Sequence, residues 1–437
     1  MRLRQIAFVG VLVGAFRLPA HAEARDIGRD TLAPDDGWAA YGTGTTGGAA
    51  ADDAHVHTVT NRAELVRALD NGSDTPKIIK IAGTIDADTD DDGDHLSCAD
   101  HATDGYSLKK YLAAYDPRTW GSAKPAGAQE EARQASAARQ AERIVLTVGS
   151  NTTLVGLGKG AVLKGASLQV RNADNVILRN LDLRDAYDCF PVRQPNTGGL
   201  GDWKTAYDTV WLTGAPHVWV DHITASDRGR PDEDEPTYFA RTYLRHDGLL
   251  DITNGSDLVT VSWRRFADHD KAMLIGNSDS ATGDRGRLRV TLHHNQFESV
   301  VQRAPRVRFG QVHVYDNRYV VPEGTEYRYS LGVSTESAIH AENNAFHTPG
   351  HVEVADLVKS WNGTALDQSG TLWGSPRTKS GGGWPVDLLA IHNACNSGSE
   401  RDLAADVGWT PTLHGKIDSA AVADREVARG AGAGRIP

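Results

Sequence analysis

Short apolar runs separated by turn residues recur along the chain from residue 144 onward. The runs are rich in β-branched residues, and Gly, Asn, Asp and Ser lie between them, which is typical of short β-strands. They span residues 144–148, 153–155, 176–178, 210–212, 218–220, 259–261, 290–292 and 312–314, and a similar run at 77–85 precedes them. This pattern predicts an all-β fold built from many short strands.

A repeated phrase links the later runs. An Asn is followed two places later by an aromatic ring in Asn295-Gln296-Phe297, Asn317-Arg318-Tyr319 and Asn344-Ala345-Phe346, at spacings of 22 and 27 residues. Repeats of this length indicate a solenoid of parallel strands, in which Asn amides hydrogen-bond between turns and the rings fill the interior. We expect the solenoid core at about 144–370, with His222 at a further corner of the ladder. On periodicity alone, unrelated hairpin turns in a β-sandwich are the alternative.

The segment 86–143 departs from the β pattern. An acid-rich loop leads into residues 128–143, which are rich in Ala, Gln, Glu and Arg and lack β-branched residues, a composition that favours helix. We therefore expect an N-terminal helical and loop insertion, and a C-terminal extension after the solenoid. Residues 23–437 are expected to form a single domain.

The first residues have the features of an export signal. Arg2 and Arg4 precede an apolar run at 6–16, and small residues suited to cleavage follow at 20–22. This pattern predicts that residues 1–22 are a signal peptide and that the protein is secreted to the extracellular space. A strand or helix of the fold is the alternative. Farther along, no apolar run approaches the length of about 18 residues needed to span a membrane, so no membrane association is expected.

The charge of the chain is acidic. The formal net charge is −11, and removal of the predicted signal peptide, which holds three Arg and no acid, leaves −14. Because nucleic-acid binding depends largely on basic side chains that neutralise phosphates, nucleic acid is not an expected partner. The three cysteines, Cys98, Cys189 and Cys395, allow at most one internal disulfide, and whether Cys98 and Cys189 pair stays open. Nothing in the sequence indicates an oligomer, so a monomer is expected.

A basic tract stands out against this acidic background. Arg303, Arg306 and Arg308 fall within six residues that contain no acid. On a strand, Arg306 and Arg308 would share one face, and guanidinium groups aimed together suit carboxylate or phosphate. The tract therefore predicts a site for an anionic ligand, with a solvated basic strand as the alternative.

Two groups of acids are candidate metal ligands. Asp247 and Asp251 would lie about 13 Å apart on a straight strand, so the backbone must bend at Gly248 for both to bind one ion. With Asp208 on an adjoining turn, three carboxylates without Cys or His would suit Ca²⁺. Ordinary turn-forming aspartates are the alternative. The loop at 88–94 matches the opening of an EF-hand, but Ala99 stands at its twelfth position, which favours a solvated acidic loop.

Several motifs in order resemble the secreted pectate lyases of polysaccharide lyase family 1. They are Gly149-Ser150-Asn151-Thr152-Thr153, Trp219-Val220-Asp221-His222, Asp247-Gly248-Leu249-Leu250-Asp251 and the tract from Gln302 to Gly310. The resemblance implies a right-handed parallel β-helix with calcium ligands at Asp208, Asp247 and Asp251. It further implies that Arg303 is the proton-abstracting base and that Lys271 and Arg308 bind substrate.

The chain departs from the family pattern at two places. Ala206 stands where some members carry an additional calcium-binding acid, and Trp263-Arg264-Arg265 occupies a place where Asn is common. The first departure predicts simpler or weaker metal binding. The second puts one position of the Asn ladder in doubt.

The activity that the resemblance implies is calcium-dependent β-elimination of α-1,4-linked polygalacturonate, giving 4,5-unsaturated oligogalacturonides. Ca²⁺ and cationic side chains would stabilise the charge that develops as the proton leaves. Because arginine normally stays protonated in proteins, the use of Arg303 as base predicts an alkaline rate optimum. The alternatives are a β-helix glycoside hydrolase, which would use paired carboxylates and water, and a non-catalytic carbohydrate-binding solenoid.

Overall fold

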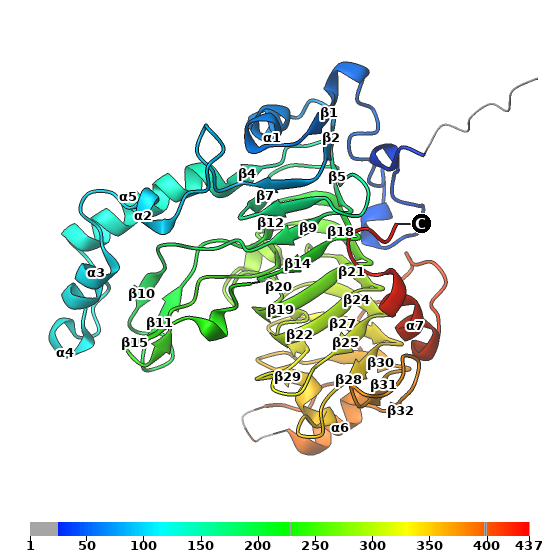
Figure 1. The fold of residues 1–437 in the computed structure, drawn as a ribbon. Helices are drawn as coiled ribbons and strands as arrows, with labels where there is room; N and C mark the ends of the chain where they lie inside the picture. The colour runs from blue at the N-terminus through cyan, green and yellow to red at the C-terminus, as the bar shows by residue number, and fades with distance from the viewer. Residues whose placement is uncertain (1–24, 228, 397, 399, 437) are drawn as a thin grey trace, which may run out of the picture.

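The computed structural model describes residues 25–227, 229–396, 398 and 400–436. The predicted signal peptide, residues 1–22, lies outside the described residues. Three long sheets of short, parallel strands stack along one axis, as Figure 1 shows, and the fold is the predicted right-handed parallel β-helix. In the described part of the chain, no helix has the length and apolar character needed to cross a membrane.

The three sheets are here called sheets 1, 2 and 3. Sheet 1 consists of β1 (Val56–Val59), β2 (Lys77–Ile81), β5 (Thr152–Gly156), β8 (Val176–Arg179), β13 (Pro216–Asp221), β18 (Asp257–Ser262), β21 (Val290–His293), β24 (Gln311–Tyr315), β27 (Ala338–Glu342) and β30 (Leu366–Ser369). Sheet 2 consists of β4 (Val145–Thr147), β7 (Ser167–Arg171), β12 (Val210–Thr213), β17 (Leu250–Thr253), β20 (Met273–Ile275), β23 (Arg306–Val307), β26 (Leu331–Val333) and β29 (Val358–Ser360). Sheet 3 consists of β3 (Thr84–Asp86), β6 (Val162–Lys164), β9 (Asp182–Arg184), β14 (Thr224–Ser226), β19 (Arg265–Lys271), β22 (Gln296–Gln302), β25 (Arg318–Val320), β28 (Ala345–His347), β31 (Leu372–Gly374) and β32 (Trp384–Pro385).

Each turn of the coil contributes one strand to each sheet, in the order sheet 2, sheet 1, sheet 3. The strands β17, β18 and β19 form one such turn, and β20, β21 and β22 form the next. The sheets already include β1, β2 and β3, so the coil begins before the expected start at residue 144. The alternating apolar residues point inward and make one continuous core along the axis.

The interior ladder confirms the repeat seen in the sequence. The Nδ2 of Asn295 donates to Oδ1 of Asn317, and Asn317 donates in the same way to Asn344, both over 3.0 Å. The rings two residues later stack face to face, with centroids 4.6 to 4.8 Å apart from Phe266 through Phe297 to Tyr319. Identical positions on successive turns therefore contact one another, which fixes the register of the coil.

The ladder differs from expectation at two turns. The strand register places Arg264 level with Asn295, and its backbone N–H donates to the Oδ1 of Asn295 over 3.0 Å. The same register puts His222 one residue earlier, in a ring stack with Trp263 and His294, and leaves Ile223 at the ladder position. The prediction for His222 is therefore wrong, because its imidazole lies outside the amide column.

The helical insertion projects from one side of the coil (Figure 1). It contains α2 (Cys98–His101), α3 (Leu108–Ala114), α4 (Pro117–Trp120) and the expected long helix, α5 (Ala128–Ile144), whereas α1 (Arg62–Leu69) packs at the first turn. Beside the insertion lie two small hairpins, β10 (Val192–Gln194) with β11 (Asp202–Lys204) and β15 (Thr237–Tyr238) with β16 (Arg241–Thr242).

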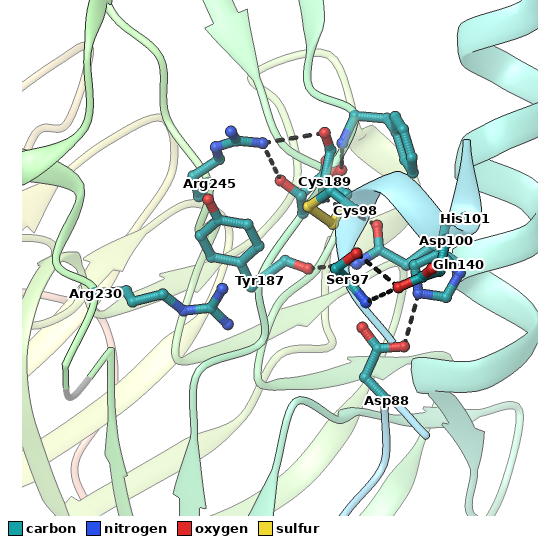
Figure 2. Close-up of a disulfide and its surroundings, with 12 residues drawn as sticks. Asp88, Ser97, Cys98, Asp100, His101, Gln140, Tyr187, Cys189, Arg230 and Arg245 are labelled. Atoms are coloured by element: carbon teal, nitrogen blue, oxygen red, sulfur yellow. Dashed lines mark hydrogen bonds and ion pairs between the residues drawn. A yellow bond between two sulfur atoms is a disulfide. The ribbon is translucent and has the colours of Figure 1, made fainter. Parts of the chain in front are cut away.

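A disulfide ties the insertion to the coil. Cys98, at the start of α2, bonds to Cys189, which follows β9, and Figure 2 shows their surroundings. The backbone N–H of Cys189 donates to Gln140 of α5, and Arg245 donates to the Cys189 carbonyl. The remaining thiol, Cys395, is free and exposed. The disulfide thus holds the insertion against the loop that follows β9.

The C-terminal extension, residues 404–436, is here called the C-terminal strap. After α6 (Leu388–Cys395) caps the last turns, the strap passes along the coil and forms α7 (Ala420–Gly430), which packs on β25 and β28. The N–H groups of Gly432, Ala433 and Gly434 then donate to the Trp263 carbonyl, Thr224 Oγ1 and Asn180 Oδ1. One segment therefore contacts turns that are far apart along the axis.

Candidate active site

The predicted site residues lie where strands of sheet 3 lead into strands of sheet 2, a region here called the aspartate corner. Asp208 precedes β12, Asp251 lies in β17, Lys271 ends β19, and Arg303 follows β22. Because β12, β17, β20 and β23 are consecutive neighbours in sheet 2, the corners of these turns stack on one another. Side chains almost a hundred positions apart in the sequence therefore gather along one edge of the coil.

Gly248 brings two of the aspartates together. Its backbone N–H donates to Oδ1 of Asp208 over 2.7 Å. A Cβ placed at Gly248 would lie 2.4 Å from Oδ1 of Asp251 and 2.9 Å from Oδ1 of Asp208, both shorter than any tolerable contact. A side chain at this position would therefore push the two carboxylates out of their present places. Asp251 is further fixed by the backbone N–H of Leu274, which donates to its Oδ1 over 3.0 Å.

The aspartates repel one another. Burial, together with the charges of Asp251 and Asp247, raises the pKa of Asp208 well above its usual range. Burial and the charge of Asp247 raise the pKa of Asp251 to about 7. Carboxylates so crowded favour either protons or a cation between them.

The donor set fits Ca²⁺. Asp208, Asp247 and Asp251 supply only carboxylate oxygens, the ligands that hard cations prefer. Within the described residues, the three do not form a compact group with all donor atoms inside 4.8 Å. Because Ca²⁺ holds its oxygen ligands at about 2.3–2.6 Å, the three carboxylates would have to turn toward one another to bind one ion, with further oxygens from water or a bound anion.

Two cationic side chains adjoin the aspartates. The Nζ of Lys271 lies 3.6 Å from Oδ1 of Asp247 and donates to the carbonyl of His246 over 3.5 Å. Burial opposes the charge of Lys271, but the carboxylates of Asp247 and Asp270 outweigh it and raise its pKa. The strand register pairs Lys271 with Gln302, so Arg303 is the next residue along.

Arg303 is held in an unusual backbone conformation. Its φ of 60° lies in the left-handed region, which a side chain other than glycine seldom adopts. Its carbonyl accepts from the N–H of Met273, and its Nε is buried without a hydrogen-bond partner. The charge of Arg303 acts on both Asp251 and Lys271. Other corners of the coil share this backbone conformation, among them those at Trp263 and His294, so it belongs to the turn of the coil.

The other arginines of the tract point elsewhere. The Nε of Arg308 donates to Oδ1 of Asp279 over 2.6 Å, and its Nη1 donates to the carbonyl of Gly276 over 3.1 Å. The Nε of Arg306 donates to Oγ of Ser334, and its guanidinium lies 4.2 Å from the centre of the Trp361 ring. Arg308 therefore has a carboxylate partner of its own in Asp279, whereas Arg306 packs on an aromatic face.

Two buried histidines, His246 and His269, lie beside the loop that carries Asp247. The sequence reasoning did not single them out. The Nε2 of His269 lies 2.6 Å from the carbonyl of Asp247, and its Nδ1 lies 2.5 Å from Oδ2 of Asp227. Burial opposes the charge of His246, but Asp227, Asp185 and further acids raise its pKa to about 10. The only signal was position, because His246 directly precedes Asp247 in the sequence.

Arg264 supports the same loop from inside the coil. It is fully buried, and its Nη2 donates to the carbonyl of Leu249, within the Asp247 to Asp251 loop, over 3.0 Å. Its guanidinium lies 4.3 Å from the centre of the Phe266 ring, while its Nε and Nη1 lack partners. The departure from Asn at this ladder position thus connects the interior of the coil to the aspartate corner.

The loop at 88–94 forms its own turn. Oδ1 of Asp90 accepts from the backbone N–H groups of Asp92 and Asp94, over 3.0 and 2.9 Å, and Arg143 pairs with Asp91. Aspartates that bond to their own backbone in this way are typical turn formers. The geometry therefore favours the solvated loop over an EF-hand-like site.

Comparisons with known proteins agree on one family. The family whose sequence model matches residues 27–108 and 122–383 is described as pectate lyase. A pectate lyase of Bacillus subtilis is 43% identical over 422 residues, which is 96% of each chain. Pectate lyase E of Dickeya dadantii is 34% identical over 363 residues, covering 81% of this chain and 79% of the relative.

Solved structures give the same result. A point mutant of the Bacillus subtilis pectate lyase superimposes with a TM-score of 0.88 at 43% identity, covering 94% of this chain and 100% of that chain. A pectate lyase bound to a hexasaccharide has a TM-score of 0.87, with the same identity and coverage.

Proposed function

This chain belongs to the pectate lyase family and is a lyase that acts on polysaccharide, and from this premise we propose that it cleaves α-1,4-linked polygalacturonate by calcium-dependent β-elimination. The observation that carries the proposal is the meeting of three mutually repelling carboxylates with Lys271 and Arg303 at one corner of the coil. The three carboxylates favour binding of a cation. With the cation bound, the ion, Lys271 and Arg303 together present positive charge to an acidic sugar.

Asp208, Asp247 and Asp251 would hold the ion. When bound, Ca²⁺ supplies Lewis-acid stabilisation of the uronate carboxylate as negative charge develops on it. The residues present fit this role because they offer hard oxygen donors and because their mutual repulsion, which Lys271 and Arg303 offset only in part, raises the pKa of Asp208 and Asp251. Gly248 keeps the space between two of them open.

The basic side chains act on the substrate. Lys271, already beside Asp247, is placed to bind a uronate carboxylate that shares the corner. Arg308 is proposed to bind a further carboxylate, with Asp279 orienting its guanidinium until the substrate arrives. Both contacts hold the sugar ring in one orientation. Less entropy is then lost when the bound substrate reaches the transition state.

Arg303 is proposed to remove the proton. The support is its place beside Asp251 and Lys271, since its charge acts on both and the cation of Lys271 crowds the guanidine. The electrons of that bond then form the carbon–carbon double bond as the glycosidic oxygen leaves, so no water is added. The product carries a 4,5-unsaturated uronate at its new end.

We further propose that the protein is secreted through the 1–22 signal and acts as a monomer. The support for secretion is the basic, apolar and small-residue order of that segment. The disulfide between Cys98 and Cys189 supports an oxidising destination.

The decisive experiment is incubation of the protein with polygalacturonate, with Ca²⁺ and after thorough chelation. The proposal expects ultraviolet absorbance from the unsaturated uronate, and its loss on chelation. A glycoside hydrolase would release reducing ends without that absorbance, and a binding solenoid would release neither. Absorbance that survives chelation would remove the metal from the mechanism.

A further inference from the structure

A row of histidines lies on the outer face of sheet 1, a different sheet from those that form the aspartate corner. The register pairs His313 with His340 and His340 with Asp367 on successive turns. Glu342 lies two places after His340 and so on the same face. In the described part of the chain, His313, His340 and Glu342 form a group whose donor atoms all lie within 4.8 Å of one another.

The contacts within this group leave two acceptors facing each other. Oε1 of Glu342 lies 2.8 Å from Nε2 of His313 and 3.5 Å from Nδ1 of His340. Oδ2 of Asp367 lies 2.9 Å from Nε2 of His340, which favours the tautomer with the proton on that nitrogen. Nδ1 of His340 then presents a lone pair to a carboxylate oxygen, and it is buried without a hydrogen-bond partner. A cation between the two atoms would turn this repulsion into binding.

The group is partly enclosed, with His313 buried and His340 and Glu342 half-buried. The His313 residue is only 1% exposed, and its Nδ1 is also buried without a partner. The Tyr315 ring lies 4.4 Å from that of His313, and the His414 ring of the C-terminal strap lies 5.8 Å from it. Trp409, also of the strap, donates to the carbonyl of Ala338 beside the group. The Nδ1 atoms of both histidines are therefore shielded from solvent, the Glu342 side chain stays 21% exposed, and a further imidazole lies nearby.

We propose that His313, His340 and Glu342 bind Zn²⁺ at a site separate from the aspartate corner. Two imidazoles and one carboxylate are an established donor set for zinc, with a fourth position left for water or another ligand. Donor atoms on a tetrahedral zinc lie about 3.4 Å apart, close to the 3.5 Å between Glu342 and His340. The shorter contact of Glu342 with His313 needs to open by about half an ångström.

Asp367 and His414 lie next to the proposed ligands, Asp367 beside His340 and His414 beside His313. A carboxylate on the far nitrogen of a ligating histidine is the usual outer partner in zinc sites, and Asp367 has that place beside His340. His414 belongs to the C-terminal strap, so an ion here lies at the junction between the strap and sheet 1. Zinc binding is therefore expected to stabilise the packing of the strap on the coil.

The test uses the full chain, stripped of metal and titrated with ZnCl₂ alone by isothermal titration calorimetry in millimolar CaCl₂. The calcium saturates oxygen-only sites, so the expected result is one Zn²⁺ per chain with a raised melting temperature. His340→Ala should weaken Zn²⁺ binding at least about 100-fold, and Asp367→Asn by about 10-fold to 100-fold. His351→Ala, at an exposed histidine elsewhere, is the matched control and should bind as the parent does.

A second measurement separates loss of the site from loss of the fold. Co²⁺ in place of Zn²⁺ should give the visible absorption of a tetrahedral site in the parent, and Glu342→Gln should abolish it while near-ultraviolet circular dichroism stays unchanged. Failure of the parent to bind Zn²⁺ in the presence of Ca²⁺ would overturn the proposal. So would unchanged affinity in His340→Ala, or loss of binding on His294→Ala instead, which would assign the ion to the group His294, Asp316 and Asp418.

Discussion

The aspartate corner and the histidine row on sheet 1 use the same stacked turns to gather ligands, but they gather different chemistry. At the corner, carboxylates meet Lys271 and Arg303. On sheet 1, imidazoles and one carboxylate lie under the strap among aromatic rings. The donor atoms determine which metal each region suits, whereas the neighbouring groups determine what a bound metal could do. Cations beside an open set of oxygens suit an acidic substrate, and enclosed imidazoles suit a structural ion.

The largest effect is expected at the base. Arg303→Lys should lower kcat on polygalacturonate by about 100-fold to 10,000-fold, because proton abstraction depends on a group of the right shape at that point. The concentration of Ca²⁺ that gives half-maximal activity should hardly change. The absorbance of unsaturated product measures both values. Arg328→Lys, at an exposed arginine, is the control, and a loss below about 10-fold in Arg303→Lys would contradict the assignment.

The next effect tests whether the corner is a calcium site. Asp251→Asn keeps an oxygen for the N–H of Leu274 but removes one charge, so half-maximal activity should need at least about 10-fold more Ca²⁺. The metal-free variant should melt at a higher temperature than the parent, because it no longer carries a buried carboxylate repelled by Asp247. Asp90→Asn, in the loop at 88–94, should change neither value. A Ca²⁺ requirement equal to that of the parent would contradict the metal assignment.

A smaller effect is expected from the interior support of the corner. Arg264→Met keeps the backbone N–H that bonds to Asn295 but removes the bond to the Leu249 carbonyl. The Ca²⁺ requirement should rise several-fold, because only part of the about 1.5–3 kcal/mol of a hydrogen bond to a charged group reaches the ion through the loop, while kcat at saturating Ca²⁺ stays nearly unchanged. Arg265→Met, the adjacent outward residue paired with Glu298, is the control. Equal Ca²⁺ requirements in the two variants would show that Arg264 is only a core residue.

The last effect is on stability rather than activity, and it is a pH dependence that arises at His294. Burial and the neighbouring charge of His293 lower the pKa of His294 to about 3, although Asp36 and Asp418 act in the opposite direction. The unfolded chain therefore takes up a proton near pH 6.5 that the folded chain refuses. Stability should fall with a slope of about 1.4 kcal/mol per pH unit as the pH drops from 6.5 toward 3.

The control for this slope is a matched ring. His294→Phe keeps a stacked ring beside Trp263 but has no proton to gain. Burial raises the pKa of the nearby Asp316 to about 7, and its contribution to stability is lost as the pH rises through that range, so it has the opposite sign to that of His294. The difference between parent and variant in chemical denaturation at several pH values isolates His294. Parallel curves would contradict the expected slope.

The sequence predicts the features that repeat and misses those that depend on two distant turns. Asn295, Asn317 and Asn344 recur with an aromatic residue two places later, so the coil could be predicted from this spacing. The roles of Asp208, Asp247 and Arg303 came from the resemblance to the family. The pairing of Cys98 with Cys189 stayed open, because it depends on how the insertion folds back on the coil. The prediction for His222 was wrong by one residue, because an imidazole can form hydrogen bonds at a turn as an amide does.

The histidine row carried a signal that the sequence reasoning did not use. His313 and His340 are 27 residues apart, the same spacing as Asn317 and Asn344. In a solenoid, equal spacing places two side chains side by side on neighbouring turns. Two ligating residues at the period of the ladder therefore indicate a shared site, whereas Glu342 and Asp367 become visible only when the face of each strand is known.

The C-terminal strap changes how the whole coil should come apart. A plain solenoid loses its terminal turns one at a time, because each turn touches only its neighbours. Here α7 lies on β25 and β28, while Gly432 and Gly434 bond to the turns of Trp263 and Asn180. Fraying at the last turns therefore also loosens the middle ones. We expect the molecule to unfold in a single cooperative transition and not by gradual unwinding.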